Sequence, residues 1–133
     1  MGRNLFVYGT LMSGAGHQMG QRLSQESRLI GAGVLEGQLF DLGEYPGLVE
    51  GGSAGGLVHG EVYELTTPGP TLIWLDEYEE ILPVQERCSE YERVERRVQL
   101  ASGSEVTAWV YVYRASVAGA RLIDSGRWAD SAR

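Results

Sequence analysis

Two groups of residues in this sequence have types and spacing that suit chemistry on a small molecule. The first is Tyr8-Gly9-Thr10-Leu11, which follows a short apolar run near the start of the chain. Backbone N–H groups after a glycine-bearing turn can converge on an anion, and glycine lets a ligand approach the backbone. The spacing matches neither a dinucleotide fingerprint nor a P-loop. The segment therefore predicts a site for a small ligand, with the alternative that it is only the turn that ends a strand.

The second is a single carboxylate, Glu79, in the segment PTLIWLDEYEEIL. At about 100° per residue this segment forms an amphipathic helix, and Glu79 falls between Leu72 and Leu75 in the apolar arc. Burial raises the pKa of a carboxyl group, which suits it to general acid–base catalysis. Glu79 is therefore a candidate catalytic residue. The structural alternatives are an ion pair with Arg93 or Arg97, or a place at the rim of the arc.

The other reactive side chains give weaker signals. Cys88 is the only cysteine, and only His17 and His59 could serve as its base, so we do not expect a cysteine nucleophile. These three residues also lack the spacing of metal ligands. The sequence therefore predicts no metal site.

Composition and charge exclude several classes of protein. A net charge of -7 argues against nucleic-acid binding, because Lys and Arg must neutralise the phosphates. No apolar stretch approaches the roughly 18 residues of a membrane span, and no signal peptide is visible. We expect a cytoplasmic protein with no membrane partner.

The elements that must position these residues form an α+β pattern without regular βαβ alternation. We predict helices over 17–26, with Leu23 inward, and over 67–82. Residues 44–56 and 101–105 are expected to form a loop and a hairpin turn. Strand 106–114 is apolar on one face and aromatic on the other, as in a small barrel or a helix-covered sheet. Strands are expected over 4–8, 29–42 (bent or bulged), 57–65, 91–100 and 106–114, within one domain spanning 1–133.

A set of short motifs occurs along nearly the whole chain in an order that resembles a known family. The motifs are Tyr8-Gly9-Thr10-Leu11, Tyr45-Pro46-Gly47, Gly60-Glu61-Val62-Tyr63, Leu75-Asp76 followed by Glu79, Tyr91 with Arg93, and Ser125-Gly126-Arg127-Trp128. Each motif is short, but the ordered set is specific. The sequence resembles the γ-glutamylcyclotransferase-like (AIG2-like) family.

This resemblance implies a fold and a reaction. The fold is a small, mainly antiparallel β-barrel flanked by helices, with a cavity at one end. The reaction is the cyclisation of a γ-glutamyl amine or γ-glutamyl amino acid to 5-oxoproline with release of the amine, as in a transferase or lyase. The resemblance implies no cofactor and no metal, and a small γ-glutamyl compound as the partner.

The resemblance also implies roles for individual residues. Glu79 would take a proton from the α-amine of the substrate and return it to the leaving amine. The turn after the first strand would hold the glutamyl unit through backbone N–H groups. The residues of this binding site would be Tyr8, Gly9, Thr10 and Leu11, with Tyr45 and Tyr91 as further candidates for the cavity wall.

The sequence departs from the family pattern at two places. Gly16-His17 stands where many members carry Asn-His, and Glu80 follows the catalytic position where Gly is usual. Both changes bear on the range of substrates rather than on the acid–base residue. The alternatives are a non-catalytic small-molecule binding or interaction module on the same fold, and an amide hydrolase or acyl-transfer variant.

Overall fold

The computed structural model describes residues 3–9, 18–42, 46–50, 56–78, 91–114, 116–123 and 125–127, with backbone alone at 18–20 and 76–78. The elements are β1 (Asn4–Val7), α1 (Gln18–Gln25), β2 (Ser27–Glu36), β3 (Gln38–Asp41), β4 (Pro46–Val49), β5 (Leu57–Leu65), α2 (Pro68–Tyr78), β6 (Tyr91–Leu100), β7 (Glu105–Tyr113) and β8 (Arg121–Leu122).

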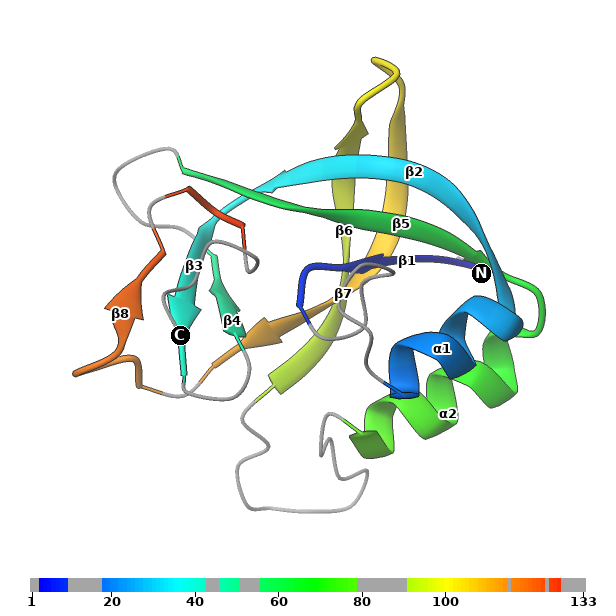
Figure 1. Ribbon diagram of the computed structural model, residues 1–133, viewed down its shortest axis with the longest axis horizontal. Helices are drawn as coiled ribbons and strands as arrows, with labels where there is room; N and C mark the ends of the chain where they lie inside the picture. Colours follow the sequence, from blue (N-terminus) through cyan, green and yellow to red (C-terminus); the bar gives the residue numbers. More distant parts are fainter. Residues whose placement is uncertain are drawn as a thin grey trace.

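Five strands form a closed barrel in the order β1-β5-β2-β6-β7. All neighbouring pairs are antiparallel except β1 with β7, which closes the barrel in parallel. A smaller sheet, in the order β4-β3-β8, lies to one side, and both helices lie on the opposite side (Figure 1). This confirms the expected antiparallel barrel flanked by helices. Among the described residues, no helix combines the length and hydropathy needed to cross a bilayer.

Two predicted elements need correction. The strand expected over 29–42 bulges between Leu29 and Gly31, as anticipated, but it ends at Glu36 and β3 continues into the smaller sheet. Residues 46–49, expected in a loop, form β4, with Leu48 opposite Leu39. Pro46-Gly47 has the composition of a turn, yet proline is also tolerated at the first position of an edge strand, which is its place here.

Strand β7 contributes buried side chains on both of its faces. On β7, Ala108, Val110 and Val112 join a buried cluster to which all five barrel strands contribute. The alternate residues Tyr111 and Tyr113 belong to a second cluster, which also contains apolar side chains of both helices. The strict alternation along β7 therefore serves a packed interior on one side and helix docking on the other.

The two glycines Gly33 and Gly60 face each other across the β2–β5 pair. A Cβ on Gly33 would lie 2.8 Å from Cγ1 of Val98. A Cβ on Gly60 would overlap the carbonyl oxygen of Val7 and lie 2.8 Å from the ring of Phe6. Glycine at position 60 therefore allows close packing of β1 beside β5, and glycine at position 33 allows close packing of β6 beside β2.

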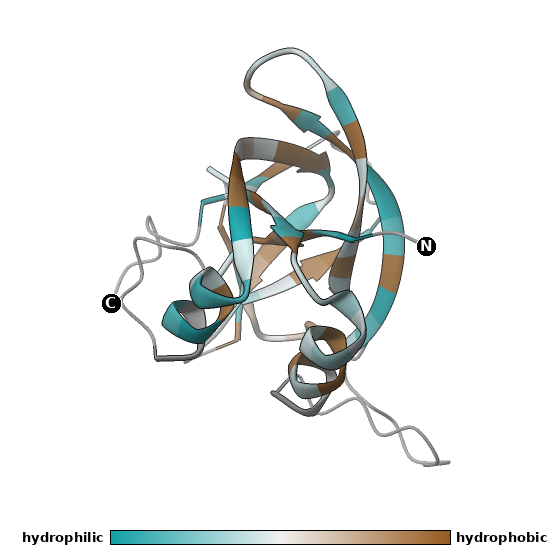
Figure 2. Cartoon of the chain, turned by 90° about the vertical axis from the view of Figure 1, so that its right-hand side faces the viewer, coloured by the Kyte–Doolittle hydropathy of each residue, from teal (hydrophilic) through white to brown (hydrophobic). Residues whose placement is uncertain are grey.

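Helix α2 presents the face predicted from its sequence. Leu72 and Leu75 are buried against the barrel, whereas Ile73, the apolar exception of the wheel, is 64% exposed. The N–H of Thr71 donates to the carbonyl oxygen of Thr67 at 3.1 Å, in keeping with the predicted start of the helix. Figure 2 shows α2 as the more apolar of the two helices. The last residues of the predicted helix, 79–82, lie outside the described residues.

The carboxylate of Glu26 joins the end of α1 to α2. Its Oε1 accepts hydrogen bonds from Trp74 Nε1 at 2.9 Å and from Thr71 Oγ1 at 2.8 Å, and its Oε2 accepts one from Arg22 Nε at 3.2 Å. The indole hydrogen bond is the main cause that lowers the pKa of Glu26, with Thr71 and Arg22 adding to it against partial burial. The ionised form therefore stabilises the packing of the two helices.

Replacing Glu26 by glutamine should lower the free energy of unfolding by about 1 kcal/mol at pH 7, because charge-assisted hydrogen bonds to Trp74 and Thr71 become neutral ones. The folded-state pKa is depressed, so this stabilisation is present above the unfolded-state pKa and is lost as the pH falls through the folded one. Urea unfolding of both proteins from pH 7 to pH 3 should show the difference shrinking. A difference independent of pH would contradict the assignment.

Candidate functional site

Tyr8 anchors the backbone that follows β1. Its ring is buried, its phenol donates to the carbonyl oxygen of Tyr111 on β7 at 2.6 Å, and it accepts a hydrogen bond from the N–H of Leu48 on β4 at 3.2 Å. The side chain thus links the barrel to the smaller sheet. This places the ring of Tyr8 in the core, between the barrel and the smaller sheet.

The next residue, Gly9, packs against β4. A Cβ here would lie 2.6 Å from Cγ and 2.8 Å from Cδ of Pro46. The sequence suggests that the side of Gly9 without a Cβ admits a ligand, but in the structure Pro46 occupies that side.

Tyr91, another predicted site residue, contacts the same proline. The carbonyl oxygen of Pro46 accepts a hydrogen bond from the Tyr91 hydroxyl at 2.7 Å, and the Tyr91 ring packs edge-on against Tyr113 with centroids 5.2 Å apart.

Replacing Gly9 by alanine is therefore expected to destabilise the fold by about 1–2 kcal/mol, because either the proline or the turn must shift. Chemical denaturation measures this, and an unchanged unfolding midpoint would show that the contact with Pro46 relaxes freely. Gly69 provides the control, because a Cβ there meets nothing within 4 Å.

The structure thus brings part of the predicted site together. Gly9 and Tyr91 both contact Pro46, and Tyr8, the neighbour of Gly9, bonds to Leu48 on the same strand β4. The other predicted site residues lie outside the described residues: Thr10, Leu11, Tyr45 and Glu79. Of the two arginines considered as ion-pair partners of Glu79, Arg97 contacts Glu105 and Arg93 lies over the ring of Trp109, while Glu79 itself lies outside the described residues.

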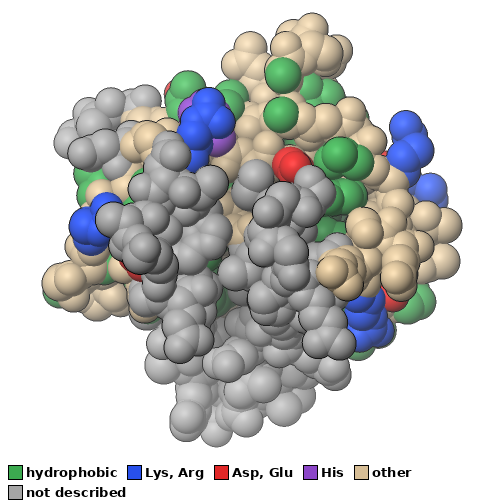
Figure 3. All heavy atoms as spheres, in the orientation of Figure 1, with side chains coloured by type: hydrophobic (Ala, Val, Ile, Leu, Met, Phe, Trp, Pro, Cys, Tyr) green, Lys and Arg blue, Asp and Glu red, His purple; other side chains and the backbone are tan. Residues whose placement is uncertain are grey.

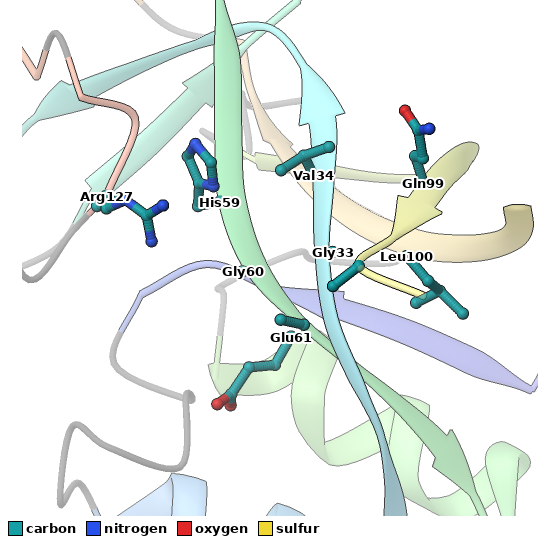
Figure 4. Close-up of a pocket in the computed structure, with 10 residues that line it drawn as sticks. Gly33, Val34, His59, Gly60, Glu61, Gln99, Leu100 and Arg127 are labelled. Carbon is teal, nitrogen blue, oxygen red and sulfur yellow. The ribbon is translucent and has the colours of Figure 1, made fainter. Parts of the chain in front are cut away.

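A groove of about 450 Å³ runs across β2, β5 and β6 on the outer face of the barrel wall (Figure 4). We call it the β5 groove. Its floor is formed by small and apolar residues, among them Gly33, Gly60, Val34 and Leu100. Its polar side chains are those of Glu61, His59, Gln99 and Arg127.

One end of the β5 groove adjoins the end of β1. Glu61 pairs in register with Val7, the residue directly before the Tyr8 turn. Its Oε1 accepts a hydrogen bond from the hydroxyl of Tyr63 at 3.4 Å. The carboxylate of Glu61 therefore lies beside the segment that the sequence assigns to ligand binding.

The other end of the groove is basic. Arg127 lies beside His59 in the close-up (Figure 4), and the space-filling view shows a basic side chain against a histidine on this face (Figure 3). The N–H of His59 donates to the carbonyl oxygen of Gly126 at 2.8 Å, which attaches the C-terminal segment to β5. Burial is the larger cause that lowers the pKa of His59, and the positive charge of Arg127 adds to it. The imidazole is therefore neutral at pH 7, and Arg127 supplies the charge.

The sequence contains a partial signal for this groove. Glu61 and Arg127 occur in motifs that carry the family resemblance, but those motifs assign them no role. Alternation along β5 does place His59 and Glu61 on the same face. The contact between His59 and Arg127 joins residues far apart in the sequence, so no local pattern predicts it. In the described ranges, no three His, Cys, Asp or Glu side chains group so that they could hold a metal ion.

Comparisons with known proteins agree with this architecture. A family model for gamma-glutamyl cyclotransferase, AIG2-like, matches residues 5–130. The gamma-glutamylcyclotransferase family protein ytfP of Citrobacter rodentium is 40% identical over 129 residues, covering 95% of this chain and 95% of that protein.

Solved structures give the same result. The solution structure of ytfP from Escherichia coli superposes with a TM-score of 0.64 at 37% identity, over 96% of each chain. The crystal structure of YkqA from Bacillus subtilis superposes with a TM-score of 0.71 at 27% identity, over 96% of this chain but only 40% of the longer YkqA. The chain therefore belongs to the gamma-glutamyl cyclotransferase, AIG2-like family.

Proposed function

We propose that this protein is a cytoplasmic γ-glutamylcyclotransferase that acts as a single domain on a γ-glutamyl amine or γ-glutamyl amino acid. The observation that carries the proposal is the family match over residues 5–130. That match spans both the Tyr8-Gly9-Thr10-Leu11 turn and Glu79.

The proposed reaction is an intramolecular acyl transfer. The α-nitrogen of the glutamyl unit attacks the γ-carbonyl carbon, a new C–N bond closes a five-membered ring, and the bond to the leaving nitrogen breaks. The products are 5-oxoproline and the free amine, and no water is consumed. Because both reacting groups belong to one molecule, holding it folded back on itself supplies much of the acceleration.

The reaction requires one proton to move. The α-amine is an ammonium ion at pH 7 and must lose a proton before it attacks, and the leaving nitrogen must gain one. We assign both steps to Glu79. Supporting this, the helical period of the sequence, continued to Glu79, predicts that this residue shares a side with Leu72 and Leu75, which are both buried against the barrel.

The turn after β1 is assigned to the glutamyl unit. Its backbone N–H groups, at Gly9, Thr10 and Leu11, would bind the α-carboxylate or the developing oxyanion. A binding turn must keep its geometry during the reaction, and Tyr8 supplies an anchor through its hydrogen bonds to two different sheets. The role of Tyr8 in this assignment is to hold the turn rather than to touch the substrate.

The direct test is to incubate the purified protein with a panel of γ-glutamyl amino acids and γ-glutamyl amines. Formation of 5-oxoproline, with the free amine in equal amount, is followed by mass spectrometry. Glutamate in place of 5-oxoproline would indicate hydrolysis instead of cyclisation. Binding without product from any member of the panel would favour the non-catalytic module.

A further inference from the structure

We propose that the β5 groove binds the leaving part of the substrate and that Arg127 recognises a carboxylate on it. The preferred substrate class would then be γ-glutamyl amino acids rather than γ-glutamyl amines that lack this carboxylate. This inference rests on the proposed cyclotransferase function, and it assigns a specificity-determining role to Arg127.

The position of the groove relative to the turn supports this assignment. Glu61 at one end adjoins the last residue of β1, so a substrate whose glutamyl unit sits at the turn can extend along β5. From Glu61 to His59 the strand advances about 7 Å. The glutamyl unit is folded back at the turn, so only the leaving amino acid, about 3.5 Å long when extended, runs along the groove, with its carboxylate directed toward the end where Arg127 lies.

The charge of Arg127 is available for a ligand. Arg96 and Arg114 both contact Glu50, and Arg121 contacts Asp41. By contrast, no carboxylate in the described part of the chain forms an ion pair with Arg127. An arginine that lines a groove without such a partner is suited to a bidentate contact with a carboxylate.

The floor of the groove fits the rest of an amino acid. Gly33 and Gly60 contribute backbone alone, and Val34 and Leu100 contribute apolar surface. A floor of this kind accommodates a small apolar side chain and offers no carboxylate for a second ammonium group except Glu61, which lies at the glutamyl end. A small neutral amino acid is therefore the leaving group that best matches the groove.

The test uses two substrates that differ only by this carboxylate, γ-glutamylalanine and γ-glutamylethylamide. Values of kcat/KM are measured for the wild-type protein, for Arg127→Gln and for Arg127→Lys. We expect Arg127→Gln to lower kcat/KM for γ-glutamylalanine by about tenfold, and to change the ethylamide by less than about twofold. For γ-glutamylalanine, the kcat/KM of Arg127→Lys should lie between those of the wild-type protein and Arg127→Gln, because lysine keeps the charge but not the paired N–H donors of arginine.

The matched control is Arg28→Gln, which removes the same charge from an exposed arginine paired with Glu64. It should leave both substrates unaffected, which separates a specific contact from a change in net charge. A wild-type protein that cyclises both substrates equally well, or an Arg127→Gln variant that affects both alike, would overturn the inference and leave the proposed cyclotransferase function intact.

A binding measurement keeps the inference testable if the wild-type protein turns over neither substrate and the proposed function fails. N-Acetylalanine and N-ethylacetamide mimic the leaving part with and without the carboxylate. In an NMR titration, N-acetylalanine should shift the amides of Gly33 and Gly60 in the wild-type protein, and not in Arg127→Gln. Equal responses to both compounds, or no response, would show that the groove does not select a carboxylate.

Discussion

Replacing Glu79 by glutamine should lower the rate of 5-oxoproline formation by about 10³-fold while the protein keeps its fold. The amide is nearly isosteric with the carboxylic acid, but it neither accepts the proton of the α-ammonium group nor donates one to the leaving amine. The loss should therefore appear mainly in kcat. If KM alone increases, Glu79 contributes to binding and another group moves the proton.

The control for this variant is Glu77→Gln on the same predicted helix. Glu77 falls on the side of the helical wheel opposite Leu72 and Leu75, so the same chemical change there should leave kcat within about twofold of the wild-type value. Thermal unfolding of both variants establishes that the fold is retained. A Glu79→Gln protein with wild-type activity would refute the acid–base assignment.

Replacing Gly60 by alanine should lower the free energy of unfolding by about 2–3 kcal/mol. The added methyl group would overlap the carbonyl oxygen of Val7, an atom of the neighbouring strand, and would press on the ring of Phe6. Neither neighbour is the free end of a flexible side chain, so the strands themselves must separate. Thermal unfolding should show a decrease in Tm of about 10 °C for a domain of this size.

Gly69→Ala is the matched control for this substitution. It adds the same methyl group on α2, where the position is exposed and a Cβ meets nothing within 4 Å. Because alanine is the better helix former, its stability should equal the wild-type value or exceed it by up to about 1 kcal/mol. If Gly60→Ala is equally harmless, the β1–β5 pair is more compliant than the contacts with Val7 and Phe6 imply.

The elements with a clear period were predictable from the sequence. The strands over 57–65 and 91–100 begin and end where the alternation of apolar and polar residues places them. The buried face of α2, with Leu72 and Leu75 inward and Ile73 outward, follows from the period of about 3.6 residues. Such periods arise from the covalent geometry of the backbone, which relates residues that are close in the chain. They can therefore be recognised in a single sequence.

The strand β4 was not predictable in the same way. Pro46-Gly47 has the composition of a turn, and its segment becomes a strand only because β3 lies beside it to accept the pairing of Leu48 with Leu39. The division of the stretch 29–42 into β2 and β3 has a similar origin. A second sheet exists at that point, and the chain leaves the barrel to join it.

The same distinction applies to the candidate site. The chemical types of its residues, the Tyr8-Gly9-Thr10-Leu11 turn and the carboxylate of Glu79, are properties of the sequence. The anchoring of Tyr8 to Tyr111 and the packing of Gly9 on Pro46 join residues far apart along the chain, so only the tertiary structure decided them. The meeting of Arg127 with His59 is also of this second kind, because the C-terminal segment reaches β5 only in the folded chain, where Gly126 accepts a hydrogen bond from the N–H of His59.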